Sequence, residues 1–307
     1  ENDVWNPKRY LNCNGVTELY GEKFHCWKKK GHGDVNMRTA IQRSCDVYFY
    51  EVARLLGVDR LSETAKKFGL GKTVLDGFIE ERSGVVPNTS WKKKFIGKNW
   101  YLGETLHSGI GQGYYQSTPL QLCLMTAQLA NGGFELKPRL LVNEEKNNLR
   151  EFIKYKNDNP NDPLPLDMLV SNFNLKPLFR NQENINFVKD AMYAATNEAG
   201  GTSYRSRLLD KKFMFAGKTG SSQIKRFTAE QRELEVKQKD LNYKDRDHAL
   251  FVAFAPVKDP QYAISVVVEH GGTGSSAAAP LAKKIIKKVL ERHELRRSYQ
   301  FSLGKEI

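Results

Sequence analysis

Long hydrophobic runs are missing from this sequence of 307 residues. No segment approaches the roughly 18 consecutive apolar residues that a membrane-spanning helix needs, which excludes a transmembrane helix within the chain. Residues 1–5 also lack the basic and apolar regions of a signal peptide. We therefore expect any membrane anchor or export signal to lie outside the 307 residues.

Cysteines are few, and acidic residues are outnumbered by basic ones. Four cysteines are too few for a disulfide-stabilised scaffold, and a hydrophobic content of 40% excludes a disordered chain. The 35 acidic residues are outnumbered by 48 lysines and arginines, so the formal net charge is +13, which favours anionic partners. The basic residues are scattered, and there is no helix-turn-helix, paired zinc-finger or RNA-binding signature. We expect no nucleic-acid partner and interpret most of the charge as solvated surface.

Three regions are predicted along the chain. Residues 1–36 form a loop-rich front region, residues 37–200 a mainly helical part, and residues 201–307 a sheet with a C-terminal helix. The front region has little apolar periodicity, so it needs something other than a local core to hold it. Helices before and after a short antiparallel sheet predict an α+β fold with a mainly helical part inserted.

Several element boundaries are marked by capping and turn residues. Asp46 is a natural N-cap for an apolar helix over 47–56, and Thr118-Pro119 opens a helix over 120–129 that is apolar nearly all round. Helices are also expected over 37–43, 59–68 and 184–196. Further expected segments are strands over 213–216, 249–255 and 262–269, a polar surface connection over 144–165, a charged excursion over 225–247 and a final amphipathic helix over 277–292.

The run Lys218-Thr219-Gly220-Ser221 is expected at the end of an apolar strand. A lysine there can polarise a nearby hydroxyl, and Thr219 and Ser221 can hydrogen-bond a carboxylate. Gly220 lets a substrate backbone lie beside the strand as an added strand. The alternative interpretation is a strand that simply ends in a turn.

A second motif, Ser44-Cys45-Asp46, lies at a break between two predicted helices. Such a break exposes a hydroxyl and a polar side chain at the edge of a cleft. A helix cap explains the same residues equally well when they are taken alone.

Together the two motifs resemble the active-site serine transpeptidases, the penicillin-binding proteins, which carry S-x-x-K, an S-D-N-like triplet and K-T-G. The resemblance covers nearly the whole chain. Within the family, the chain resembles the elongation-type class B subgroup. It implies a penicillin-binding transpeptidase or serine β-lactamase-like fold, with an antiparallel sheet flanked by helices. Its further matching segments are 27–33, 80–84, 109–113, 118–122, 131–133, 201–202, 248–256 and 269–272.

The resemblance also implies roles for the motif residues. In this family a serine attacks the D-alanyl-D-alanine end of a peptidoglycan stem peptide, and an amine of a neighbouring stem resolves the acyl-enzyme. Ser44 would relay a proton towards the leaving amine, Asp46 would orient this relay, and Lys218 would hold Ser44 and raise the local positive potential. Thr219 and Ser221 would bind the terminal carboxylate, and the Ser221 N–H would form half of the oxyanion hole.

One feature departs from the family pattern. The family's S-x-x-K precedes the triplet, whereas the patterns that begin at Ser90, Ser222 and Ser302 all follow Ser44, and none opens an apolar helix. We interpret these three as chance matches in a lysine-rich chain. We therefore expect residues 1–307 to be a transpeptidase domain lacking its upstream S-x-x-K segment. Asp46 also stands where many relatives have asparagine.

Three of the cysteines suggest a metal site in the front region. Cys13, Cys26, His32 and Cys45 follow the spacing C-x12-C-x5-H-x12-C, which supplies three thiolates and an imidazole for a tetrahedral zinc ion. This spacing is not a zinc-finger signature, but a bound ion would hold a region that has little core of its own. The alternatives are a Cys13–Cys26 disulfide with a structural His32, or free thiols.

Two classes of function fit these observations. The first is a peptidoglycan D,D-transpeptidase of cell elongation at the periplasmic face of the inner membrane. Its expected partners are stem peptides, β-lactams and elongation-complex membrane proteins that include a glycosyltransferase. The second is a non-catalytic β-lactam or peptidoglycan sensor, or a pseudo-transpeptidase. An S-x-x-K at a helix start upstream of Glu1 would favour the enzyme.

Overall fold

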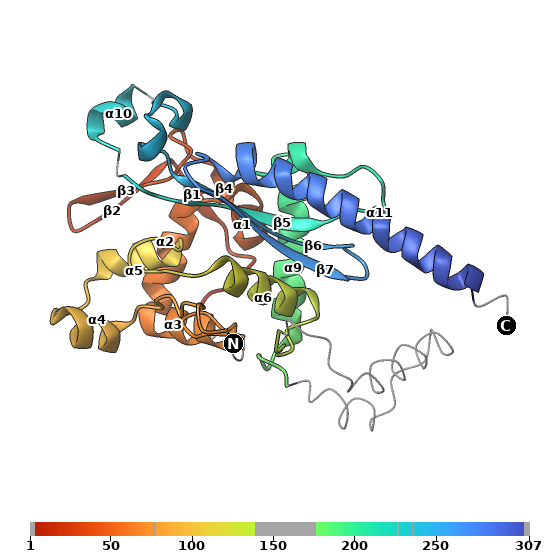
Figure 1. The fold of residues 1–307 in the computed structure, drawn as a ribbon. Helices are drawn as coiled ribbons and strands as arrows, with labels where there is room; N and C mark the ends of the chain where they lie inside the picture. The colour runs from red at the N-terminus through yellow and green to blue at the C-terminus, as the bar shows by residue number, and fades with distance from the viewer. Residues whose placement is uncertain (1–3, 76–77, 139–175, 226, 235, 304–307) are drawn as a thin grey trace.

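The computed structural model describes residues 4–75, 78–138, 176–225, 227–234 and 236–303 (Figure 1). The surface connection expected over 144–165 lies outside these residues. In chain order the elements are β1 (Leu11–Cys13), β2 (Val16–Leu19), β3 (Glu22–His25), β4 (Gly33–Val35), α1 (Met37–Arg43), α2 (Asp46–Leu56), α3 (Val58–Lys67), α4 (Thr89–Ile96), α5 (Leu102–Gly109), α6 (Pro119–Ala130), α9 (Gln182–Asn197), η1 (Tyr204–Ser206), β5 (Ala216–Ser222), α10 (Ala229–Glu233), η2 (Gln238–Asp240), η3 (Tyr243–Asp245), β6 (His248–Ala255), β7 (Tyr262–Val268), η4 (Gly274–Ala278) and α11 (Ala279–Leu303).

The main sheet is antiparallel with the order β5-β6-β7, so β6 is its central strand. The register pairs Lys218 with Val252 and Ser221 with Ala249. The expected strand over 213–216 is wrong in its position: β5 begins at Ala216 and continues through Ser222. Every residue of β5 has a partner on β6, which holds this polar run extended. The K-T-G motif therefore lies within a strand and not at its end.

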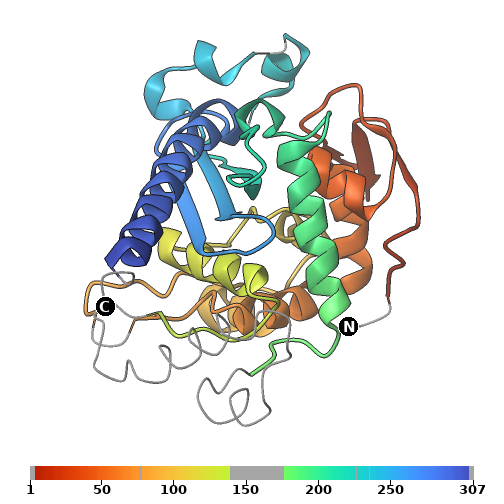
Figure 2. The same cartoon turned by 90° about the vertical axis from the view of Figure 1, so that its right-hand side faces the viewer.

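Alternate residues of β6 face two separate cores. Ala249, Phe251 and Ala253 pack with Ala282 and Ile286 of α11 on one face of the sheet. On the other face, the core around Phe254 contains residues of α6 and α9. Figures 1 and 2 show α11 along one side of the sheet with α6 and α9 on the opposite side. This two-sided covering confirms the α+β fold with helices around an antiparallel sheet.

The front region has more regular structure than the sequence predicts. Strand β1 pairs with β4, and β2 pairs with β3, in two small antiparallel sheets. These strands of three or four residues have too short an apolar pattern to be recognised in the sequence. Their buried side chains join α2 in one core that contains Cys13, Cys26, Cys45 and Tyr48. The front region is thereby anchored against the helix that follows Ser44.

Other boundaries match the sequence more closely. Helix α6 begins as expected, with Pro119 at its first turn and the Thr118 side chain accepting a hydrogen bond from the Gln121 N–H. The charged excursion contains α10 and two short 3-10 turns, and Lys29 of the front region donates to its Glu233 carbonyl. Helix α11 runs on to Leu303, beyond the expected end. No helix in the described part of the chain is long and apolar enough to cross a bilayer.

A buried ion pair fixes α4 against α5 and gives a prediction about stability. The Lys92 ammonium, 2% exposed, contacts the Glu104 carboxylate at 2.5 Å. Glu104→Gln should lower the free energy of unfolding by about 3 kcal/mol because it leaves a buried charge without its partner. Glu51→Gln is the matched control, since its partner Arg54 is 41% exposed and the pair is worth at most about 1 kcal/mol. Urea unfolding of both variants measures the difference, and equal losses would contradict this interpretation.

Candidate active site

Ser44 lies in a strained turn between two helices. It is the C-cap of α1 and adopts φ 54° and ψ 55°, in the left-handed region that few non-glycine residues occupy. Its hydroxyl faces the sheet, where Lys218 Nζ donates to Ser44 Oγ at 2.5 Å. The structure therefore brings together the two motifs that the sequence places 174 residues apart. Strain at such a position is typical of a functional site.

Lys218 is held between the strand and the helix break. Its Nζ also donates to the Thr219 carbonyl at 2.9 Å. Burial lowers the pKa of Lys218 to about 8, and the charge of Asp46 opposes this shift. The lysine is thus a desolvated hydrogen-bond donor directed at the Ser44 hydroxyl.

Asp46 does not cap a helix as the sequence suggests. Helix α2 begins at Asp46 itself, Cys45 is its N-cap, and the Asp46 carboxylate accepts a hydrogen bond from the Trp27 N–H at 2.8 Å. The Trp27 indole N–H donates to the Ser44 carbonyl at 2.7 Å. Burial raises the pKa of Asp46 to about 7, and the neighbouring Cys26 adds to the shift. Trp27 therefore clamps both sides of the triplet, a role that sequence reasoning missed because it depends on contact between distant segments.

The Thr219 hydroxyl on β5 has a partner from outside the K-T-G motif. Thr219 Oγ1 lies 2.9 Å from Thr202 Oγ1, in the segment that follows α9. Two residues before Thr219 on the same strand, Gly217 is held by the buried Thr196 hydroxyl through both its N–H and its carbonyl. Residues 201–202 are one of the segments that match the family pattern, but the sequence assigns them no role. The structure gives Thr202 one, because it sets the position of the Thr219 hydroxyl.

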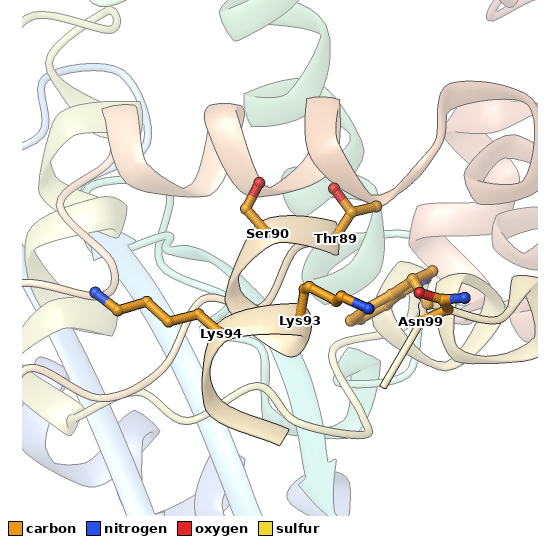
Figure 3. Close-up of a pocket in the computed structure, with 6 residues that line it drawn as sticks. Thr89, Ser90, Lys93, Lys94 and Asn99 are labelled. Carbon is orange, nitrogen blue, oxygen red and sulfur yellow. The ribbon is translucent and has the colours of Figure 1, made fainter. Parts of the chain in front are cut away.

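The S-x-x-K patterns inside the chain lie in other surroundings. Ser90 and Lys93 lie on α4 and line a surface pocket with Thr89, Lys94, Asn99 and Trp100 (Figure 3). Lys225, which completes the pattern from Ser222, pairs with Asp245 at 3.6 Å. The side chain of Ser302 lies outside the described residues. None of the hydrogen bonds found for the described residues joins Lys218 to a serine other than Ser44.

The four proposed metal ligands form one buried cluster. Cys13 Sγ, Cys26 Sγ and Cys45 Sγ lie with a His32 ring nitrogen so that all four atoms are within 4.8 Å of one another. His32 Nδ1 is 3.7 Å from Cys13 Sγ and 3.5 Å from Cys26 Sγ. A tetrahedral zinc ion with ordinary bond lengths needs sulfur–nitrogen edges of roughly 3.5 Å. The donor set and its size therefore fit zinc, and all four cysteines of the chain are free.

Electrostatics within the cluster favour one thiolate. A hydrogen bond from the Cys45 thiol lowers the pKa of Cys26 to about 3 against the opposing effect of burial, and His32 lowers it further. The same contact raises the pKa of Cys45 well above its usual range. The opposite shifts of Cys26 and Cys45 reflect their mutual contact within the cluster. A cation would hold both as thiolates.

A buried lysine on the edge strand β5 thus faces a serine in a left-handed turn between two helices. The family model for the penicillin binding protein transpeptidase domain matches residues 1–287. The chain belongs to this family, which confirms the resemblance drawn from its motifs.

Individual relatives agree with this assignment. The chain is 36% identical over 265 residues to the peptidoglycan D,D-transpeptidase MrdA of Haemophilus influenzae, covering 86% of this chain and 38% of that protein. It is 33% identical over 270 residues to MrdA of Escherichia coli K12, covering 88% and 39%. Among solved structures, penicillin-binding protein 2 of Pseudomonas aeruginosa in complex with WCK 5153 superimposes with a TM-score of 0.73 at 34% identity, covering 94% of this chain and 57% of that one.

A second solved structure extends the likeness. The complex of penicillin-binding protein 2 with MreC from Helicobacter pylori gives a TM-score of 0.75 at 31% identity, covering 94% of this chain and 46% of that one. Both structures confirm the transpeptidase fold. The chain spans about two fifths of the length of the curated relatives, as the coverages of 38% and 39% show.

Proposed function

We propose that this chain is the transpeptidase domain of a peptidoglycan D,D-transpeptidase that cross-links stem peptides during cell elongation. The observation that carries the proposal is the 2.5 Å contact between Lys218 Nζ and Ser44 Oγ. This contact links the two motifs that the family uses together. The nucleophile is the serine of an S-x-x-K motif outside the 307 residues. The S-x-x-K patterns that begin at Ser90 and Ser222 have no hydrogen bond to Lys218 among the described residues.

The proposed reaction has two acyl transfers. The nucleophilic serine forms an ester with the penultimate D-alanine as the peptide bond breaks, and the departing D-alanine amine takes a proton by way of Ser44. An amine of a neighbouring stem then attacks the ester, forms the cross-link and releases the serine. Lys218 fixes the Ser44 hydroxyl and supplies positive potential to the substrate carboxylate. Asp46, held by the Trp27 N–H, orients the relay.

Thr219, Gly220 and Ser221 would hold the donor peptide. The Thr219 and Ser221 hydroxyls bind its terminal carboxylate, and Gly220 leaves space for the peptide backbone beside β5. The Ser221 N–H supplies one donor of the oxyanion hole. β-Lactams would occupy the same subsite because they imitate the D-Ala-D-Ala end.

A first test uses the 307-residue chain alone. We expect it to form no stable adduct with benzylpenicillin, because the one serine that Lys218 contacts among the described residues is proposed to relay protons and not to attack. A longer polypeptide that includes the S-x-x-K serine should take up close to one equivalent. Intact-mass spectrometry measures both. An adduct mapped to Ser44, Ser90, Ser222 or Ser302 would contradict the assignment.

We also propose that the cluster of Cys13, Cys26, His32 and Cys45 holds a structural zinc ion. The fit of the four donors to a tetrahedral ion supports this, as does the burial of all four residues. The ion would supply a rigid link between the front region and the helix break, since Cys45 lies between Ser44 and Asp46. The ion takes no part in the acyl transfer.

The proposed partners and location follow from the same function. Stem peptides and β-lactams would bind at β5, and membrane proteins of an elongation complex, including a glycosyltransferase, would assemble with the full protein. The Helicobacter pylori relative, solved as a complex with MreC, supports such an assembly. The domain would face the periplasm at the inner membrane, with its anchor outside the 307 residues.

A further inference from the structure

The outer edge of β5 is where an added strand would bind, and its backbone directions can be followed residue by residue. In an antiparallel pair, successive residues point their N–H and C=O groups alternately towards and away from the partner strand. Gly217 points both groups away from β6, because both contact the Thr196 hydroxyl. The Thr219 carbonyl also points away, to Lys218 Nζ. Two residues further on, Ser221 therefore directs its N–H and carbonyl to the free edge.

The Ser221 carbonyl is already occupied by a side chain from across the site. Gln112 Nε2 donates to Ser221 O at 2.7 Å, and Gln112 Oε1 accepts from the Gln223 N–H at 3.4 Å. The Gln112 carboxamide thus bonds the Ser221 carbonyl and the Gln223 N–H, which are two residues apart on the chain. The backbone N–H and C=O of one residue in an added parallel strand would make the same two bonds. Gln112 therefore fills part of the position that an extended ligand needs.

The backbone of the loop around Gln112 is fixed on both sides of this residue. Gln112 follows α5, and the residues on either side of it are Gly111 with φ 73° and Gly113 with φ 79°. Both conformations favour glycine, so the motif sets the backbone on each side of the glutamine. A backbone bond from the Gln112 N–H to the His107 carbonyl ties the loop to the end of the helix. The sequence match over 109–113 thereby gains a function that the proposed reaction does not use.

We propose that Gln112 is a specificity-determining residue that closes the edge of β5 at Ser221 until a ligand with a backbone-like N–H displaces it. The proposal rests on the proposed function, since the ligands are a stem peptide or a β-lactam that carries an acylamino group. The incoming N–H replaces the Gln112 Nε2–H on the Ser221 carbonyl, and the released carboxamide turns to water. A ligand without this N–H leaves Gln112 in place, because displacing it would leave the Ser221 carbonyl without a donor.

The test compares two β-lactams on the longer polypeptide that includes the S-x-x-K serine. Benzylpenicillin carries the acylamino N–H, and penicillanic acid is the same bicyclic ring system without it. The measured quantity is the ratio of their acylation rate constants. Gln112→Ala removes the competing donor, so we expect this ratio to rise roughly 2- to 10-fold, the range that a single net hydrogen bond gives. Gln112→Glu keeps the length of the side chain but has no donor, so it should raise the ratio in the same way.

Gln116→Ala is the matched control, because Gln116 is an exposed glutamine of the same loop region. It should leave the ratio unchanged. An unchanged or lower ratio in Gln112→Ala would overturn the inference, and so would a rise in Gln112→Ala without one in Gln112→Glu. If both rates fall by the same factor, the loop is only structural and the inference also fails. If neither β-lactam acylates the wild-type polypeptide, the proposed function itself fails, which is a separate and recognisable outcome.

Discussion

In the longer polypeptide that includes the S-x-x-K serine, Lys218→Ala should lower the rate of acylation by a fluorescent penicillin at least about 100-fold. Removing one preorganised hydrogen-bond donor from an active site has an effect of this size. The reason is that the Lys218 ammonium is the donor that fixes the Ser44 hydroxyl, at 2.5 Å, and also binds the Thr219 carbonyl. Ser44→Ala should have a similarly large effect because it removes the other half of the pair.

Lys225→Ala provides the control for this experiment. Lys225 follows the same strand, but its side chain is 63% exposed and pairs with Asp245. Its substitution removes one exposed positive charge from the segment after β5 and should change the rate by less than about threefold, since exposed pairs contribute little. Thermal unfolding of each variant confirms that it is folded. Unchanged labelling in both Lys218→Ala and Ser44→Ala would refute the assignment of the site.

Zinc removal should have the second large effect. Protein purified without added metal should contain close to one equivalent of zinc, and chelation should release it. We expect a smaller loss of stability than the order of 10 kcal/mol that structural zinc contributes in small peptides, because two cores fold most of this chain without the metal. Hydrogen exchange should then accelerate in the front region and around Cys45, while α6 and β6 stay protected.

Cys123→Ser is the control for the metal. Cys123 lies on α6, where its thiol donates to the Ala263 carbonyl, so its substitution should leave the zinc content unchanged. Cys13→Ser and Cys26→Ser should each lower it strongly. Less than about half an equivalent of zinc, together with a Cys13–Cys26 disulfide in a peptide map, would rule out a structural metal site.

Much of the fold can be read from local signals in the sequence. The Thr118-Pro119 start of α6 is specified by a hydroxyl cap and a proline, which act within one turn. The four cluster ligands were also found, because metal donors are chemically distinctive even when their spacing is irregular. These features depend on residue type and short-range order, so the sequence alone carries them.

The features that the sequence did not predict depend on distant partners. Strand β5 extends through polar residues because β6 pairs with it, and Asp46 bonds Trp27 instead of capping a helix. The roles of Thr202 and Gln112 likewise arise from contacts with β5 across the site. Neither residue has a local signal for such a contact beyond its place in a family motif.

The most direct test of the central claim is the release of D-alanine and the formation of cross-links by the longer polypeptide. The substrate is a glycan polymer that carries pentapeptide stems, and liquid chromatography with mass spectrometry quantifies free D-alanine and cross-linked stems. If the domain is a transpeptidase, free D-alanine and cross-linked stems should rise together, and both should disappear in Lys218→Ala. Stable penicillin labelling without any D-alanine release would contradict the account and would favour a non-catalytic binding module.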